Sequence, residues 1–242
     1  MEKKIDLIFE GLKEKSTVKQ AIYRNTKAAF EQMKAVSQEV VQTLVNRMSE
    51  VDQTVVIEFK NMSEFEFQVK FSGDLLIFIM HSNVVTFPDS HPILNTDYVE
   101  VDFKRRFFGH IMAYNFMADS IKYSRMQDPG YLIGRMLINY DNKFFLEGVK
   151  ELDLSKQDIE RNDITKDTLC LIVESAIIAA INNDLMAPEL NDIEKITVRE
   201  KVENQQVSRG TKVGFHFNYQ GWGIKYSEIN NLRNSMCAGS AL

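Results

Sequence analysis

The chain has 242 residues, of which 44% are hydrophobic and 10% aromatic, and this composition excludes a mainly disordered protein because it supplies the apolar side chains of a core. A formal net charge of −5 and a pI near 5.5 exclude a generally basic surface of the kind that attracts nucleic acid or anionic membranes. Two cysteines, Cys170 and Cys237, exclude a disulfide scaffold, and no apolar run resembles a signal peptide or reaches the roughly 20 residues of a membrane span. We therefore expect a cytoplasmic protein without a membrane segment.

The first predicted element is a long helix at residues 17–50. Neither glycine nor proline occurs between Leu12 and Ser72, and apolar residues recur every eleven positions, which corresponds to about 3.67 residues per turn. Ser16 and Thr17 are typical of a helix N-terminus, and the helix would be roughly 50 Å long. The two apolar series are Val18, Ala29, Val40, Val51 and Ile22, Met33, Leu44.

The β-rich middle of the chain, residues 53–149, alternates apolar and polar side chains, which predicts an antiparallel meander. Residues 84–87 either extend the third strand or form a short fourth one. Residues 107–123 favour a helix, while their β-rich surroundings also permit a strand. The strands are predicted at 54–60, 65–71, 75–81 and 98–104, followed by a hairpin of 131–140 with 143–149 around Asp141-Asn142.

A second helix is predicted at residues 163–185, where apolar side chains go nearly all round, as is typical of a buried helix. Residues 196–202 and 212–219 favour a C-terminal β-hairpin, and residues 230–242 are expected to be a frayed tail. We therefore expect one α+β domain over residues 1–242, in which the long helix and the buried helix pack on a mainly antiparallel sheet. Residues 150–161 are the one candidate for an internal boundary.

Two acids and a lysine form a candidate catalytic group. Pro88-Asp89 is followed by Asp102-Phe103-Lys104, a local pattern that resembles the PD-(D/E)xK nuclease family. The resemblance implies that Asp89 and Asp102 hold Mg²⁺, that Lys104 acts near a phosphate of nucleic acid, and that Glu31 or Glu39 supplies an acid from the first helix. The alternative is an ordinary strand with Glu100, Asp102 and Lys104 on its solvent face.

The four histidines, His81, His91, His110 and His216, lack the spacing of a zinc site. A metal site built on them is therefore not expected, although His91 lies two residues from Asp89.

Two functions remain. The first is a non-catalytic intracellular module that binds a protein or a small ligand and self-associates through its long helix, because a chain of this size cannot easily cover about 50 Å of apolar stripe. The homo-oligomer would then form across a two-fold axis. The plainer alternative for the stripe is that it packs on the sheet and on the helix at 163–185. The second function is a metal-dependent phosphodiesterase that uses Asp89, Asp102 and Lys104.

Overall fold

The chain is an α+β protein in the computed structural model, which describes residues 2–148, 159–186 and 211–214. In chain order, with η for a 3-10 helix, its elements are α1 (Glu2–Ser49), β1 (Ile57–Ser63), β2 (Glu66–Phe71), β3 (Asp74–Val85), η1 (Pro92–Asn95), α2 (Asp97–Val101), η2 (Phe103–Arg106), β4 (Phe108–Met117), α3 (Ala118–Lys122), β5 (Tyr131–Ile138), β6 (Phe144–Gly148), η4 (Ile159–Arg161), α4 (Lys166–Ile181), β7 (Asn183–Met186) and β8 (Thr211–Gly214).

Strands β1 to β6 form one antiparallel sheet in which each strand pairs with the next one along the chain. The tight turns place Ser72 and Asn142 at φ 55° and 60°, in the left-handed region that asparagine enters more readily than most residues. The predicted meander and the hairpin around Asp141-Asn142 are confirmed. Residues 84 and 85 prolong the third strand.

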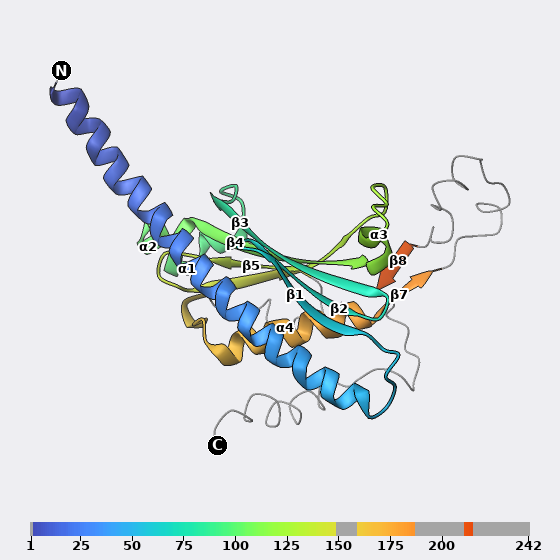
Figure 1. The fold of residues 1–242 in the computed structure, drawn as a ribbon. Helices are drawn as coiled ribbons and strands as arrows, with labels where there is room; N and C mark the ends of the chain where they lie inside the picture. The colour runs from blue at the N-terminus through green and yellow to red at the C-terminus, as the bar shows by residue number, and fades with distance from the viewer. Residues whose placement is uncertain (1, 149–158, 187–210, 215–242) are drawn as a thin grey trace.

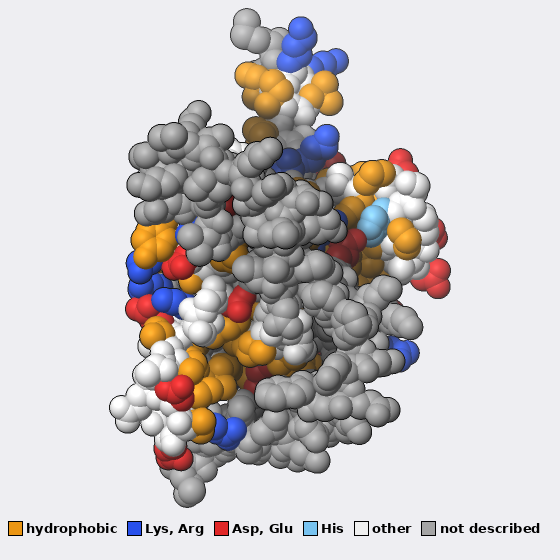
Figure 2. Space-filling model, turned by 90° about the vertical axis from the view of Figure 1, so that its right-hand side faces the viewer, with side chains coloured by type: hydrophobic (Ala, Val, Ile, Leu, Met, Phe, Trp, Pro, Cys, Tyr) orange, Lys and Arg blue, Asp and Glu red, His pale blue; other side chains and the backbone are white. Residues whose placement is uncertain are grey.

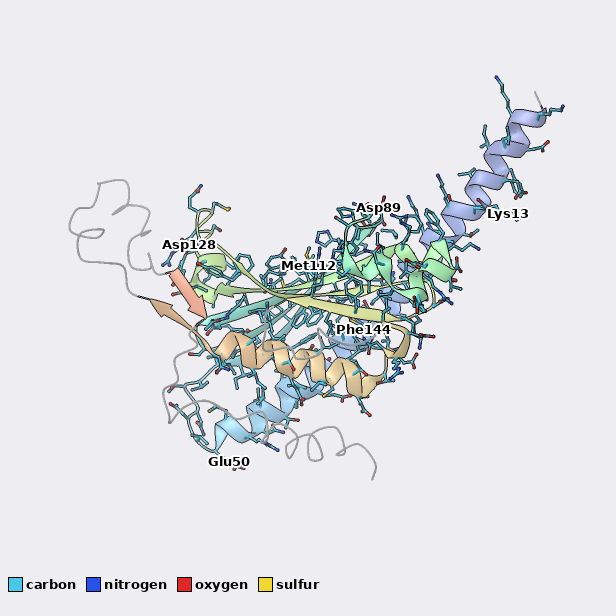
Figure 3. All side chains as sticks on the ribbon, turned by 180° about the vertical axis from the view of Figure 1, so that it is seen from behind. Lys13, Glu50, Asp89, Met112, Asp128 and Phe144 are labelled. Atoms are coloured by element: carbon cyan, nitrogen blue, oxygen red, sulfur yellow. The ribbon has the colours of Figure 1, made fainter. Side chains whose placement is uncertain are left out.

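Helices α1 and α4 cover one face of the sheet (Figure 1). Phe30 of α1 lies 5.3 Å from Phe67 of β2, ring centre to ring centre, and Phe67 stacks on Phe78 of β3 at 4.5 Å. Figure 3 labels Phe144 where β6 faces α4, and this side chain is fully buried. The main core of the protein therefore lies between the sheet and the two helices.

The predicted apolar stripe of the long helix packs within the same chain. Its members from Val18 to Val40 are buried, and Leu44 packs against the core. Val51 lies beyond the helix and is exposed. The plainer alternative for this stripe is thus confirmed, so a second copy is not needed to cover it.

The opposite face of the sheet, called the open face below, carries the strand residues that alternate with the core ones. Met112, which Figure 3 labels, lies on this face, directly across from Ile79 of β3 and Arg135 of β5. One end of it is covered by η1 and α2, which place Leu94 and Val99 in a smaller apolar cluster. The rest of the open face carries apolar side chains such as Ile79 and Met112 together with polar ones such as His81 and His110.

Helix α1 begins well before the predicted start at residue 17. It starts at Glu2, so the predicted N-terminus at residue 17 is wrong. Thr17 lies inside the helix, and its hydroxyl donates to the carbonyl oxygen of Lys13 one turn earlier. Although serine and threonine favour helix caps, inside a helix their hydroxyl can instead bond to the carbonyl oxygen four residues earlier, so the residue type alone does not mark an N-terminus. Gly11 did not end the helix.

The strand predicted at 98–104 is wrong, because these residues form α2 and η2. Tyr98 and Val99 are adjacent and both buried, whereas Val101 and Phe103 are exposed, so burial does not alternate. The Asp102 side chain accepts a hydrogen bond from the backbone N–H of Lys104. Such a local bond turns the chain and competes with an extended strand.

The helix favoured at 107–123 is also wrong, since residues 108–117 form β4 and only 118–122 are helical. Gly109, Ile111, Ala113 and Asn115 are buried in alternation. The pairing with β3 and β5 on both sides decides the outcome, and neither partner is close in sequence.

The second helix is confirmed but ends at Ile181, and residues 183–186 form β7 instead of its last turn. Strand β7 pairs with β8, at residues 211–214, in a separate two-stranded sheet. The predicted partner strand at 196–202, the rest of the hairpin and the tail at 230–242 lie outside the described residues, as does most of the proposed boundary at 150–161. One domain over 1–242 stays a prediction. In the described part of the chain, no helix has both the length and the apolarity that a bilayer crossing requires.

Candidate functional site

Asp89 lies in the turn between β3 and η1 and points outward. Its side chain is 89% exposed. Oδ1 accepts a hydrogen bond of 2.6 Å from Nη2 of Arg106, which also lies over the ring of Phe103. The carboxylate of Asp89 is therefore paired with an arginine at the rim of the open face (Figure 3).

Asp102 acts as a cap between α2 and η2. Oδ1 accepts from the backbone N–H of Lys104 at 3.0 Å, and Oδ2 accepts from the Tyr140 hydroxyl. The hydrogen bond from Tyr140, followed by that from Lys104, lowers the pKa of the Asp102 carboxyl. Asp102 and Lys104 do not share a strand face, because they lie in and beside a 3-10 helix.

The nuclease resemblance requires Asp102 and Lys104 to lie on a strand, and in the structure they lie in and beside helical turns. Among the described residues, no group of three or more histidine, cysteine, aspartate or glutamate side chains could hold a metal ion. Glu31 and Glu39, the expected helix acids, pair with Lys34 and Lys166 at 2.9 and 2.8 Å. A Mg²⁺-dependent phosphodiesterase built on Asp89, Asp102 and Lys104 remains a prediction that these contacts do not favour.

A polar network holds the α2–η2 segment in place. The Tyr98 hydroxyl donates to Asp141 Oδ2 at 2.8 Å, and Arg105 Nε donates to the same oxygen at 2.9 Å. Asn139 Nδ2 donates to the Tyr98 hydroxyl, and Asn25 of α1 donates to the Asn139 carbonyl oxygen. Burial raises the pKa of the Tyr98 hydroxyl to about 12, so it stays a donor at neutral pH. The network therefore joins α1, the β5–β6 turn and α2 and acts as a structural clamp.

A group of exposed apolar side chains lies on the first turns of α1. Residues 3–17 are all exposed, and we call residues 2–17 the arm. The arm projects from the body of the protein, and Figure 2 shows apolar side chains beside lysines on it. Its large apolar side chains, with their exposed fractions, are Ile5 (60%), Leu7 (74%), Ile8 (61%), Phe9 (60%) and Leu12 (57%).

These side chains continue the pattern of the buried part of the helix. Leu7 lies eleven residues before Val18, so it extends the series whose later members are buried. Ile5, Ile8 and Leu12 follow the spacing of three and four residues that forms one apolar side of a helix. An apolar surface of this kind, extending past the body that would cover it, is typical of an interaction site.

A pair of histidines lies on the open face. His81 of β3 and His110 of β4 are directly opposite each other, with ring centres 4.5 Å apart in an edge-to-face arrangement. Both ring nitrogens of His110 are shielded from solvent and have no hydrogen-bond partner among the described residues. Burial, followed by the charges of His81 and Arg135, lowers the pKa of His110 to about 4. His110 is thus a neutral imidazole at physiological pH.

Next to this pair, a row of side chains linked by polar contacts crosses β5 and β6. Arg135 of β5 faces Glu147 of β6 and donates to its Oε2. Glu147 Oε1 lies 2.9 Å from Nε2 of His91, whose Nδ1 accepts from the Ile93 backbone N–H. Because Nδ1 of His91 acts as an acceptor, the ring proton lies on Nε2, which donates to Glu147. His91 thereby anchors η1 to the sheet.

Comparison of the chain with protein-family models, with curated proteins and with solved structures finds no match. The arm is the feature that the sequence analysis missed. The sequence signal for the arm is the spacing of Ile5, Ile8 and Leu12, which lies before the N-terminus predicted at Ser16 and Thr17. The histidine pair gave no such signal, because it depends on the pairing of two strands.

Proposed function

We propose that this chain is a non-catalytic binding module that self-associates through the arm of its long helix. The observation that carries the proposal is the exposure of five large apolar side chains within eight residues of one projecting helix. A solvent-exposed helix with such a surface gains free energy when a second apolar surface covers it.

The charges of the arm support a second copy as the partner. Residues 2–17 carry four lysines and four acidic residues, so the arm has no net charge and no electrostatic attraction to anionic lipid. An antiparallel pair that sets Ile8 beside Phe9 of the second copy also sets Ile5 beside Leu12. The same pairing brings Lys13 of one copy within about one helical turn of Asp6 of the other, on the same side of the apolar contact. Opposite charges that flank the apolar contact in this way stabilise coiled coils.

The expected association is weak. If pairing half-buries the ten large apolar side chains of two arms, the gain is about 10 kcal/mol. Association costs about 4–15 kcal/mol in lost rigid-body freedom. With a cost near the lower end of that range, about 5 kcal/mol, the net gain is about 5 kcal/mol, which corresponds to a dissociation constant of roughly a few hundred micromolar. Such a dimer dissociates on dilution unless the bodies also touch.

The test is the molar mass of the full chain, measured by light scattering over a concentration series. We expect a monomer at low concentration and a rising mass at high concentration. Ile8→Glu places a charge in the centre of the paired surface and keeps the chain a monomer. Val51→Glu, an equal change at an apolar residue that is 81% exposed outside the arm, leaves the rise in mass unchanged.

Two outcomes contradict the proposal. One is a wild-type chain that stays monomeric over the whole series. The other is an oligomer whose mass does not respond to Ile8→Glu, because its interface would lie elsewhere.

A further inference from the structure

A cavity of about 260 Å³ opens on the open face at the end away from η1 and α2. Three strands and one short helix line it: β1 through Glu58 and Lys60, β2 through Gln68 and Lys70, β3 through Leu75, and α3 through Ala118, Asp119, Ile121 and Lys122. A volume of this size is slightly below the usual range for small-molecule sites, which begins at about 300 Å³. It suits a compact ligand.

The lining carries more positive than negative charge, although the whole chain is acidic. Three lysines and two acids surround the cavity. Glu58 pairs with Lys60 at 3.1 Å, and in the strand pairing it lies directly opposite Lys70. Lys70 is half-buried and makes no ion pair with the residues that the structure describes. The cavity therefore has one positive charge, that of Lys70, that a ligand can neutralise.

The remaining lining residues give the cavity a fixed polar group and an apolar wall. Gln68 is only 8% exposed, and its Nε2 donates to Glu66 Oε1 at 2.7 Å, which holds the amide in one orientation. Leu75 is buried at the base, and Ile121 is 44% exposed at the edge. A held amide, lysine ammonium groups and an apolar wall together suit a small polar ligand with an apolar part.

We propose that this cavity binds a small organic anion, in which a carboxylate or a phosphate group meets Lys70 and Lys122 and a compact apolar body lies against Leu75 and Ile121. The anion replaces the missing partner of Lys70. Lys60 stays with Glu58, and Gln68 contacts a polar atom of the ligand. The inference does not depend on self-association, because the arm does not line the cavity.

The experiment is a titration of the full chain, followed by amide NMR shifts, with three probes: phenyl phosphate, benzoate and inorganic phosphate. Phenyl phosphate and benzoate should shift amides of β2 and α3 in a saturable way, with a dissociation constant of about 1 mM or tighter. The two organic probes distinguish a phosphate from a carboxylate preference. Inorganic phosphate, which lacks the apolar body, should bind at least about tenfold more weakly.

Variants locate the effect. Lys70→Gln and Lys122→Gln should each weaken binding of the preferred probe by about tenfold. Lys19→Gln, which removes the same charge from the exposed side of α1, should leave it unchanged. The proposal is overturned if no probe gives a saturable shift, if inorganic phosphate binds as tightly as phenyl phosphate, or if Lys19→Gln weakens binding as much as Lys70→Gln. Dispersed wild-type-like spectra of the variants show that they are folded.

Discussion

Asp102 shows how one side chain can fit a catalytic pattern and still serve the fold. Its carboxylate accepts two hydrogen bonds, from the Lys104 backbone and the Tyr140 hydroxyl, and both are contacts within the chain. Asp89 likewise pairs with Arg106. The spacing of Asp89, Asp102 and Lys104 could be read from the sequence, but the partners could not, because Tyr140 comes from a distant turn.

Replacing the donor of this bond tests the role of Asp102. In Tyr140→Phe the carboxylate loses its largest stabilising contact, so its pKa should rise towards the usual range. Because the folded-state pKa is depressed, the contact stabilises the protein above the unfolded pKa near 4 and is lost as pH falls through the folded value. We expect a loss of about 1 kcal/mol at pH 7, measured by urea unfolding.

Tyr131→Phe is the matched control, since Tyr131 lies on β5, the strand that leads into the turn of Tyr140, and has no hydrogen bond from its hydroxyl among the described residues. The account is contradicted if the two variants unfold at the same urea concentration at pH 7.

His110 makes stability depend on pH in mild acid. Its pKa is lowered from 6.5 to about 4 by burial, so the folded protein holds it neutral. The resulting stability is present above pH 6.5 and is lost as pH falls from about 6.5 to about 4, where the unfolded chain takes up the proton first. His110→Leu should remove this contribution to the pH dependence of the free energy of unfolding. The contribution is about 1 kcal/mol after allowance for partial solvent exposure.

The measurement is urea unfolding of both proteins at pH 8, 6 and 4.5. Below pH 6.5 the free energy of unfolding should fall more in the wild type than in the variant. Parallel curves over the whole range would show that His110 does not titrate differently in the folded and unfolded protein.

At the scale of the element, the contact between α1 and β4 depends on the absence of a side chain at Gly109. A Cβ atom there would lie 2.1 Å from Thr26 Oγ1 and 3.0 Å from its Cβ, and Thr26 is buried with its hydroxyl bonded to the Ile22 carbonyl oxygen. The helix therefore lies directly on the strand at this point.

Gly109→Ala should destabilise the protein by about 2–3 kcal/mol, because the helix and the strand must separate to admit a methyl group. Gly73→Ala is the control, since a Cβ there meets nothing within 4 Å. Thermal unfolding checks both. An equal, small shift in the two variants would contradict the described packing of α1 on β4.

Element prediction succeeded where the pattern is local and failed where pairing or capping decides. The eleven-residue series fixed the long helix, and alternation fixed β1 to β3. Residues 107–123 have the apolar spacing of a helix, yet β3 and β5 pair with residues 108–117 on both sides. At 98–104 the alternation of apolar and polar residues predicted a strand. The residues form helical turns instead, which are stabilised by the Asp102 cap and by the burial of both Tyr98 and Val99.

At the scale of the whole molecule, the long helix has two parts with different roles. Its stripe from Val18 to Val40 was expected to need a second copy, and it packs on the sheet and α4 instead. The arm before it has no cover among the described residues. The sequence predicted a stripe too long for one chain to cover, whereas the uncovered apolar side chains lie before residue 17, outside the predicted helix.

The arm also makes a geometric prediction. In the antiparallel pair proposed above, Ile5 of one copy lies beside Leu12 of the other, whereas a parallel pair brings identical residues together. Cysteines report the difference, because a disulfide needs Cα atoms about 4.4–6.8 Å apart. The background is the full chain with Cys170 and Cys237 replaced by alanine, so that no other thiol competes.

The most direct test mixes Ile5→Cys and Leu12→Cys proteins under mild oxidation and measures the covalent dimer by non-reducing electrophoresis. We predict that the mixture forms the mixed disulfide efficiently, that each protein alone forms little dimer, and that Ile8→Glu in both proteins abolishes the product. Efficient cross-linking of each protein alone would show parallel pairing. Equal, slow cross-linking in every combination, unaffected by Ile8→Glu, would contradict self-association through the arm.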